Sequence, residues 1–297
     1  MRVLVLGSSG MVGSALMNHL QERGDAGVGL DVAAKDADSR LDISNWDQVR
    51  ACRHFETAEL VVLLAAATDV DYCEKDPDLA FRVNAFGPQL VARRCAELDR
   101  PLVQVSTAAV FAGNPKREPY TEYDAPAPVN QYAISKLHGE IAVRESLRRH
   151  YIVRAGWMIG GGVEDKKFVG KIVAQLLEGK RKLLAVDDKR GSPTYTVDFA
   201  KNLMALAATG HYGTYHMANH GSCTRHDIAR KIVEFMGVDC VVDPVPSSYF
   251  PLPAARPDSE VLRNRKLELI GLDLMPPWEQ SLKDYLRWLV PALQAKK

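Results

Sequence analysis

The stretch "VLVLGSSGMVGSALMNHLQERG", from Val3 to Gly24, decides which fold we expect for the whole chain. Its first residues form a short, continuous apolar run, which is typical of a strand buried on both faces. The residues after the glycines have the pattern of a helix that ends at Gly24. A buried strand, a glycine turn and a helix in this order predict the first unit of a parallel α/β sheet.

The turn between that strand and that helix has the spacing of a dinucleotide-binding site. Its first glycine permits a tight turn, its second lets the backbone approach a pyrophosphate, and its third lets helix and strand pack closely. The free N–H groups of the helix N-terminus favour phosphate. The cofactor-binding residues predicted in this turn are Gly7, Gly10, Met11, Val12 and Gly13.

Outward from this unit, strands and helices continue to alternate. Short apolar runs separated by helical patterns predict a doubly wound parallel sheet covered on both faces. The expected strands are 27–32, 59–67, 101–106, 151–156 and, late in the chain, 213–219; the expected helices are 44–55, 76–98, 130–150 and 276–289. Ser44 and Asp47 have the spacing of a capping box, and we expect Gly87 and Pro88 to kink the helix that contains them.

The last third of the chain is richer in loops and prolines. We therefore expect a smaller substrate lobe over the carboxyl edge of the sheet. The predicted division gives residues 1–158 to a dinucleotide-binding domain, to which 193–220 returns, and gives 159–192 and 221–297 to the lobe.

The composition excludes several classes of protein. A net charge of +1, from 38 basic and 37 acidic residues, gives no electrostatic footprint for nucleic acid. The longest apolar runs are too short to span a bilayer, and the first strand is not preceded by a leader, so we expect a cytoplasmic protein. The five scattered cysteines argue against a disulfide framework or zinc site. No metal site is predicted, and His211, His216 and His220 are interpreted as strand and loop residues.

An acidic residue follows the second expected strand, where a carboxylate can bind the ribose hydroxyls of NAD and repel a 2′-phosphate. This residue is Asp31, and it favours NAD(H). Lys35 and Arg40 lie close by in sequence and leave NADP(H) open. Asp42 and Ile43 are candidates to flank the adenine, with an ordinary helix-entry loop as the alternative.

Tyr132 and Lys136 lie four residues apart in an expected helix, so their side chains share a face. A lysine ammonium beside a phenol is expected to lower the tyrosine pKa and make the phenol an acid–base catalyst. Upstream, Ser106 and Thr107 end a strand and offer a hydroxyl to a substrate carbonyl, although capping of the strand end would explain them alone. The predicted catalytic set is Tyr132, Lys136, Thr107 and Ser106.

With these residues in order, the chain resembles the extended short-chain dehydrogenase/reductase superfamily, and within it the dTDP-4-dehydrorhamnose reductase family. The motifs that carry the resemblance are "GSSGMVG", "LDIS", "AAATDVDYCEKDP", "VNAFGPQLVARRC", "STAAVF", "PVNQYAISKLHGE", "VRAGWMIG", "GSPTYTVDFA" and "ARPDSEVL". The resemblance implies a Rossmann fold and a reductase that passes hydride from NAD(P)H to C4 of a nucleotide-linked 4-keto-6-deoxy sugar, in dTDP-rhamnose biosynthesis. By analogy it also implies a homodimer.

Carried over by position, Tyr132 would donate the proton, Lys136 would hold the nicotinamide ribose, and Thr107 would polarise the carbonyl. The resemblance further implies that the cofactor is lined by Ala65, Ala66 and Thr68, and the sugar side by Trp157 and Arg256.

The chain departs from the family pattern in "STAAVF", where relatives commonly have Asp-Tyr in place of Ala108 and Ala109. We expect a roomier, less polar pocket there, which leaves the sugar and the keto position open. Two other functions also remain open: an NAD-dependent nucleotide-sugar epimerase or dehydratase, and a non-catalytic dinucleotide-binding regulatory subunit. Retention of Tyr132, Lys136 and Thr107 argues against the second.

Overall fold

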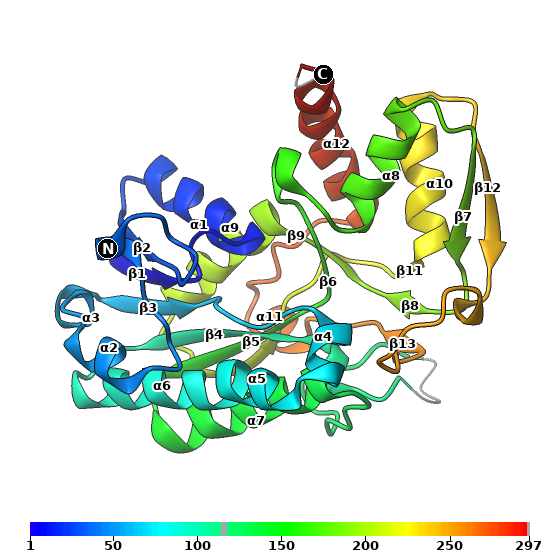
Figure 1. Cartoon of the computed structure of the whole chain (residues 1–297). Coiled ribbons are helices and arrows are strands. Elements are labelled where there is room, and N and C mark those ends of the chain that lie inside the picture. The colour runs from blue at the N-terminus through cyan, green and yellow to red at the C-terminus, as the bar shows by residue number, and fades with distance from the viewer. Residues whose placement is uncertain (114–117, 296–297) are drawn as a thin grey trace.

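The computed structural model describes residues 1–113 and 118–295, and its centre is a parallel sheet of six strands. The strand order is β10-β5-β4-β3-β1-β2 (Figure 1). The strands are β1 (Arg2–Leu6), β2 (Ala26–Leu30), β3 (Leu60–Leu63), β4 (Leu102–Thr107), β5 (His150–Ala155) and β10 (Gly213–His216). The predicted doubly wound parallel sheet is therefore confirmed.

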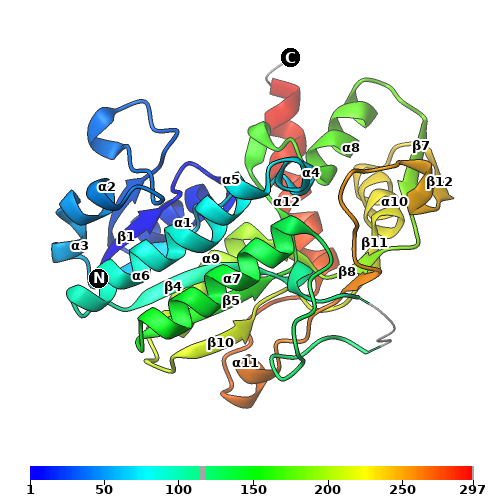
Figure 2. The same cartoon turned by 60° about the horizontal axis from the view of Figure 1, so that its bottom comes forward.

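Helices cover both faces of this sheet (Figures 1 and 2). One face carries α1 (Met11–Glu22) and α9 (Thr196–Ala207); the other carries α2 (Trp46–Ala51), α3 (His54–Thr57), α6 (Gly87–Glu97) and α7 (Gln131–Ser146). Alternate residues of β1 point to opposite faces. Val3 and Val5 pack with α1 and α9, whereas Leu4 and Leu6 pack on the other side. A strand covered on both faces has no polar face, which explains its continuous apolar run.

Two details of the expected helices are wrong. The helix over 44–55 is divided into α2 and α3, and its cap is Asn45, whose side chain accepts from the Gln48 N–H at 3.2 Å. Ser44 does not cap it because its hydroxyl donates to Asp42 instead. The expected helix over 76–98, by contrast, is confirmed as one continuous helical run, made of α5 (Pro77–Phe81), a π-helical segment (Arg82–Phe86) and α6, with its irregularity beside Gly87 and Pro88 as expected. The wide turn comes just before Pro88, which lacks the N–H that an α-helix would need there.

The second part of the structure is a small lobe beside the carboxyl edge of the sheet (Figure 1). Its helices α8 (Phe168–Leu177), α10 (Arg225–Met236) and α12 (Trp278–Ala295) share one apolar core. Its short strands are β6 (Trp157–Ile159), β7 (Lys182–Val186), β8 (Arg190–Gly191), β9 (Pro193–Tyr195), β11 (Cys223–Thr224), β12 (Val241–Val245) and β13 (Ser259–Glu260). The predicted C-terminal helix is present as α12. The exact domain boundaries stay a prediction.

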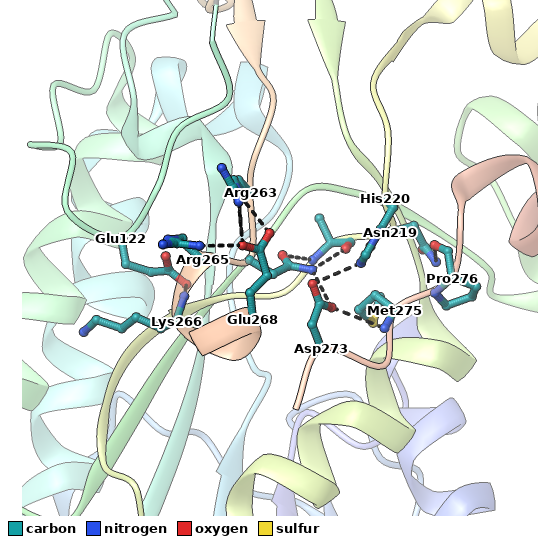
Figure 3. Close-up of polar contacts among 12 residues, drawn as sticks. Glu122, Asn219, His220, Arg263, Arg265, Lys266, Glu268, Asp273, Met275 and Pro276 are labelled. Atoms are coloured by element: carbon teal, nitrogen blue, oxygen red, sulfur yellow. Dashed lines mark hydrogen bonds and ion pairs between the residues drawn. The ribbon is translucent and has the colours of Figure 1, made fainter. Parts of the chain in front are cut away.

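The segment around α11 (Arg265–Leu269) connects the lobe back to the main sheet (Figure 3). The Lys266 N–H donates to Glu122 at 3.2 Å, and His220 Nε2 bonds Asp273 at 3.0 Å. Leu267 and Met275 join the core beneath α1 and α9. Residues of the 221–297 segment thus pack on the sheet as well as in the lobe.

Within the part of the chain that the structure describes, no helix combines the length and the apolar composition that crossing a membrane requires.

His216, at the end of β10, is fully buried and makes a structural contact. Its Nδ1 lies 3.2 Å from the carbonyl oxygen of Tyr120, and its ring meets the Phe111 ring edge-on. Burial, reinforced by the nearby Arg154 charge, lowers the pKa of His216 to about 3. In the folded protein His216 therefore stays uncharged near pH 6.5, where a histidine of the unfolded chain takes up its proton.

We predict that His216 makes the fold acid-sensitive. Between the unfolded pKa of 6.5 and the folded value of about 3, the unfolded chain binds a proton that the native chain does not, so stability falls as pH falls. The free energy of unfolding, measured with urea, should fall between about pH 7 and about pH 5. This fall should be roughly 2 kcal/mol larger for the native protein than for a His216→Asn variant. Equal losses in the two proteins would contradict this role.

Candidate active site

A cavity of about 870 Å³ lies where the carboxyl ends of β1, β2 and β3 meet the lobe. The ends of parallel strands are the usual place for ligands in such sheets. Every cofactor-binding residue predicted from the sequence except Lys136 lines it: Gly7, Gly10, Met11, Val12, Gly13, Asp31, Asp42, Ile43, Ala65, Ala66 and Thr68. Tyr132 lines it too, so the sequence motifs and the predicted proton donor open onto one space.

The glycine turn is built by close backbone contacts. Gly7 has φ +92°, and a Cβ there would lie 2.5 Å from the Ala65 nitrogen. A Cβ on Gly13 would lie 2.2 Å from the Gly7 carbonyl oxygen, whereas one on Gly10 would meet only ordinary contacts at 3.4 Å. Gly7 and Gly13 are therefore required by packing. Gly10 lies at the start of α1, where no side chain caps the free N–H groups.

Asp31 is held beside this turn at the end of β2. Its Oδ2 accepts from the Ser9 N–H at 3.1 Å and its Oδ1 from the Ala33 N–H at 2.9 Å. Arg40 is exposed and donates to the Ala34 carbonyl at 3.0 Å, so its guanidinium is already engaged. The carboxylate, rather than the arginine, is the charged group that faces the cavity here. A glycine turn with an acid fixed beside it fits a dinucleotide.

The helix that carries the predicted proton donor, Tyr132, is anchored at its first turn. Asn130 caps α7 by accepting from the Ala133 N–H at 2.9 Å, and its amide donates to the Ala255 carbonyl at 2.8 Å. Two residues on, Tyr132 is half-buried and lines the cavity, and the Thr107 side chain at the end of β4 is near enough to lower its pKa. The structure thus brings the tyrosine and one of the two predicted hydroxyls together.

Lys136 does not lower the tyrosine pKa as the sequence suggested. Its Nζ donates to the Val105 carbonyl of β4 at 2.7 Å, and burial lowers its own pKa to about 8. Burial raises the pKa of Tyr132 to about 12, and the Thr107 hydrogen bond offsets this only in part. The expectation is wrong because desolvation of the phenol outweighs its neighbours. A phenol with this pKa keeps its proton at neutral pH.

Ser106 has a different partner from Thr107. Its hydroxyl donates to Glu140 Oε1 at 2.6 Å, and Glu140 is itself paired with Arg154 through contacts of 2.9 and 2.7 Å. All three side chains are buried. Because a serine has a single O–H to donate, Ser106 has no proton left for a substrate carbonyl. The geometry therefore supports Thr107 as the hydroxyl of the site and gives Ser106 a structural contact.

The two predicted substrate-side residues lie behind the cavity wall. The Trp157 indole N–H donates to Glu260 Oε2 at 2.7 Å, and Arg256 pairs with Asp71 at 2.9 Å. Asp71 lies in α4 (Val70–Lys75), so Arg256 ties the C-terminal segment to the main domain. Neither residue lines the cavity itself. Their contact with substrate stays a prediction.

Ala108 and Ala109 are both buried, and Ala108 packs in an apolar cluster with Phe111 and Leu262. Neither residue belongs to the lining of the cavity. The effect of these two alanines on the choice of sugar stays a prediction.

The wall supplied by the lobe was missed from the sequence. It includes Asp165, Lys167 and Phe168 at the start of α8, and Arg225 at the start of α10. The capping box of Thr224 and Asp227 could have located the start of α10. No local pattern shows that its first residue faces a cavity, since that depends on how the lobe packs.

Comparisons with known proteins agree with this geometry. The model of the family described as RmlD substrate binding domain matches residues 1–290. A dTDP-4-dehydrorhamnose reductase from Mycobacterium tuberculosis is 38% identical over 286 residues, covering 95% of this chain and 91% of that protein. A solved dTDP-4-dehydrorhamnose reductase from Clostridium acetobutylicum has 36% identity and a TM-score of 0.89, with 97% and 99% of the two chains covered. One from Bacillus anthracis, solved in complex with NADP, has 34% identity and a TM-score of 0.89, with coverage of 96% and 98%.

We predict that alanine at Gly10 and at Gly13 separates binding from folding. Gly13→Ala should lower the free energy of unfolding by about 3 kcal/mol, because backbone atoms must move to admit the Cβ. Gly10→Ala should cost less than about 1 kcal/mol but weaken dinucleotide binding at least about tenfold, by blocking the approach of the phosphates. Calorimetric titration and urea unfolding measure the two effects. A Gly10→Ala variant that binds dinucleotide normally would refute the phosphate site.

Proposed function

The chain belongs to the RmlD substrate binding domain family, and from this premise we propose that it reduces the 4-keto group of a nucleotide-linked 4-keto-6-deoxy sugar with NAD(P)H. The observation that carries the proposal is the Tyr132 phenol, which opens onto the cavity that the glycine turn also lines and has Thr107 as a neighbour. The relatives named dTDP-4-dehydrorhamnose reductase support the substrate class, because they match almost the full length of the chain.

The residues of the chain account for the proton that reduction of a ketone requires. A bound nicotinamide dinucleotide would supply the hydride. Tyr132, with its pKa of about 12, retains the phenolic proton at neutral pH and gives it to the carbonyl oxygen as negative charge develops there. Thr107 donates a hydrogen bond to the same oxygen. Lys136, with a pKa of about 8, is mostly charged at neutral pH, and its remaining donors would hold the ribose of the nicotinamide.

The form of the cofactor rests on two opposing indications. The Asp31 carboxylate faces the cavity and disfavours a 2′-phosphate, which supports NAD(H). The Bacillus anthracis relative was solved with NADP, which supports NADP(H). Asp31 alone therefore sets no preference for NAD(H), and either dinucleotide is the proposed hydride donor.

The alternatives are less compatible with the site. An epimerase or dehydratase oxidises and re-reduces the same sugar, whereas the relatives that match at 35–38% identity over almost the whole chain are named reductases. A regulatory subunit would need the dinucleotide cavity but not the pair of Tyr132 and Thr107. Cytoplasmic location and a homodimer remain part of the proposal by analogy with the family.

We predict that the purified protein oxidises NADH or NADPH, followed by absorbance at about 340 nm, when dTDP-4-keto-6-deoxy sugar is added. Tyr132→Phe should lower this rate at least about a hundredfold, because the proton donor is lost. Its affinity for the dinucleotide should stay within about threefold of the native value, since the glycine turn and Asp31 are untouched. Retained turnover in Tyr132→Phe would refute the proton-donor role.

The two neighbouring hydroxyls provide a matched comparison. Thr107→Val should lower kcat by about a hundredfold through loss of a donor to the carbonyl oxygen. Ser106→Ala should leave kcat within about threefold but lower the free energy of unfolding by about 1–2 kcal/mol, because Glu140 loses a buried hydrogen bond. Steady-state kinetics and urea unfolding separate these outcomes. The opposite order of effects on kcat would show that Ser106, rather than Thr107, contacts the substrate.

A further inference from the structure

Arg225 is a cation on the cavity wall without a polar partner. It begins α10, and its guanidinium carbon lies 4.0 Å from the centre of the Trp157 ring and 5.2 Å from that of Phe168. These two aromatic rings restrain the guanidinium. Within residues 1–113 and 118–295, the guanidinium of Arg225 makes neither a hydrogen bond nor an ion pair. Its N–H donors are therefore available to a ligand.

The acidic residues near this arginine are engaged elsewhere. Glu260 acts on Arg225 electrostatically, but its Oε2 accepts the Trp157 indole N–H and it forms no ion pair with the guanidinium. Asp165 accepts from the Lys167 and Gly170 N–H groups and from the Tyr285 hydroxyl at 3.0 Å. Neither carboxylate occupies the donors of Arg225.

The guanidinium of Arg225 is charged and faces the cavity. Arg225 is half-buried and burial lowers its pKa, yet arginine stays charged in proteins at any physiological pH. Because it lines the cavity, an anionic ligand bound there can accept from its free N–H groups. Phosphate matches the planar fork of the guanidinium with two parallel hydrogen bonds.

The position of Arg225 points to the substrate rather than to the cofactor. Arg225 lies over the ring of Trp157, which is bonded to Glu260, and Glu260 acts electrostatically on both Arg225 and Tyr132. Arg225 and Tyr132 both line the cavity. The glycine turn that fits the dinucleotide phosphates comes from β1 and α1 instead. Lys167 adds a second cation, from the start of α8, to the wall that carries Arg225.

We propose that Arg225 is the group that binds the diphosphate of the nucleotide-linked sugar. Bound there, the diphosphate fixes the nucleotide on the lobe and leaves the sugar to extend toward Tyr132. This inference rests on the proposed function, and it assigns to the lobe residue the recognition of the charged part of the substrate.

The test is calorimetric titration of dTDP, and separately of UDP, into the protein saturated with NADPH. Arg225→Gln should weaken binding of the nucleoside diphosphate at least about tenfold, the usual scale for losing a charge-assisted hydrogen bond to phosphate. Arg225→Lys keeps the charge but loses the planar fork, so its affinity for the nucleoside diphosphate should lie between those of the native protein and Arg225→Gln. Arg230→Gln, an exposed arginine of the same helix, is the matched control and should bind as the native protein does.

Affinity for NADPH, measured for each variant, shows that the variant is folded and should stay within about twofold of the native value. In turnover, Arg225→Gln should raise KM more than it lowers kcat, because the diphosphate contact is made in ground state and transition state alike.

Three results would overturn the assignment: native binding of dTDP and UDP by Arg225→Gln, an equal loss of NADPH affinity in that variant, or no binding of either nucleotide by the native protein. Failure of the proposed function looks different. A protein that binds dTDP through Arg225 but never oxidises NADPH with the keto sugar would keep this anion site and lose the reductase assignment.

Discussion

The buried ion pair between Glu140 and Arg154 fixes the helix on which the site depends. Glu140 belongs to α7 and Arg154 to β5, and Ser106 of β4 donates to the same carboxylate. Charges buried this deeply are strongly destabilising unless they are paired, so α7 has one favourable position on the sheet. The Lys136 contact with Val105 and the Asn130 cap hold the same helix nearer its start. Together they set Tyr132 beside Thr107.

The cavity is formed by the main domain on one side and by the lobe on the other. The main domain contributes the glycine turn, Asp31 and, from α7, the proposed proton donor Tyr132. The lobe contributes an opposing wall that includes Arg225. Trp157, which contacts Arg225, is itself held on two sides: its N–H is bound by Glu260, and a Cβ on Gly191 would lie 2.4 Å from its ring. Arg225 rests on that fixed ring. Because this ring is fixed, the long side chain of Arg225 keeps one position at the cavity wall.

The sequence predicted the parts of the site that local patterns encode. A strand, a glycine turn and an acid after the next strand follow from spacing alone, and because parallel strands end at one edge, these residues converge on one cavity. Properties set by packing between distant segments could not be predicted. The pKa of Tyr132, the choice between Ser106 and Thr107, and the position of Arg225 all depend on which groups α7, β4 and the lobe bury together. The cap at Asn45 instead of Ser44 was missed because Asp42 competes for the serine hydroxyl.

The proposed reduction is tested most directly by following the hydride from the dinucleotide to the sugar. The protein is supplied with nicotinamide dinucleotide deuterated at the transferred position and with dTDP-4-keto-6-deoxy sugar, and the sugar product is analysed by mass spectrometry. A reductase should place one deuterium at C4 of the sugar and form one equivalent of oxidised dinucleotide for each sugar produced. A sugar that is rearranged without deuterium, and without net consumption of the dinucleotide, would contradict a reductase and indicate an epimerase or dehydratase.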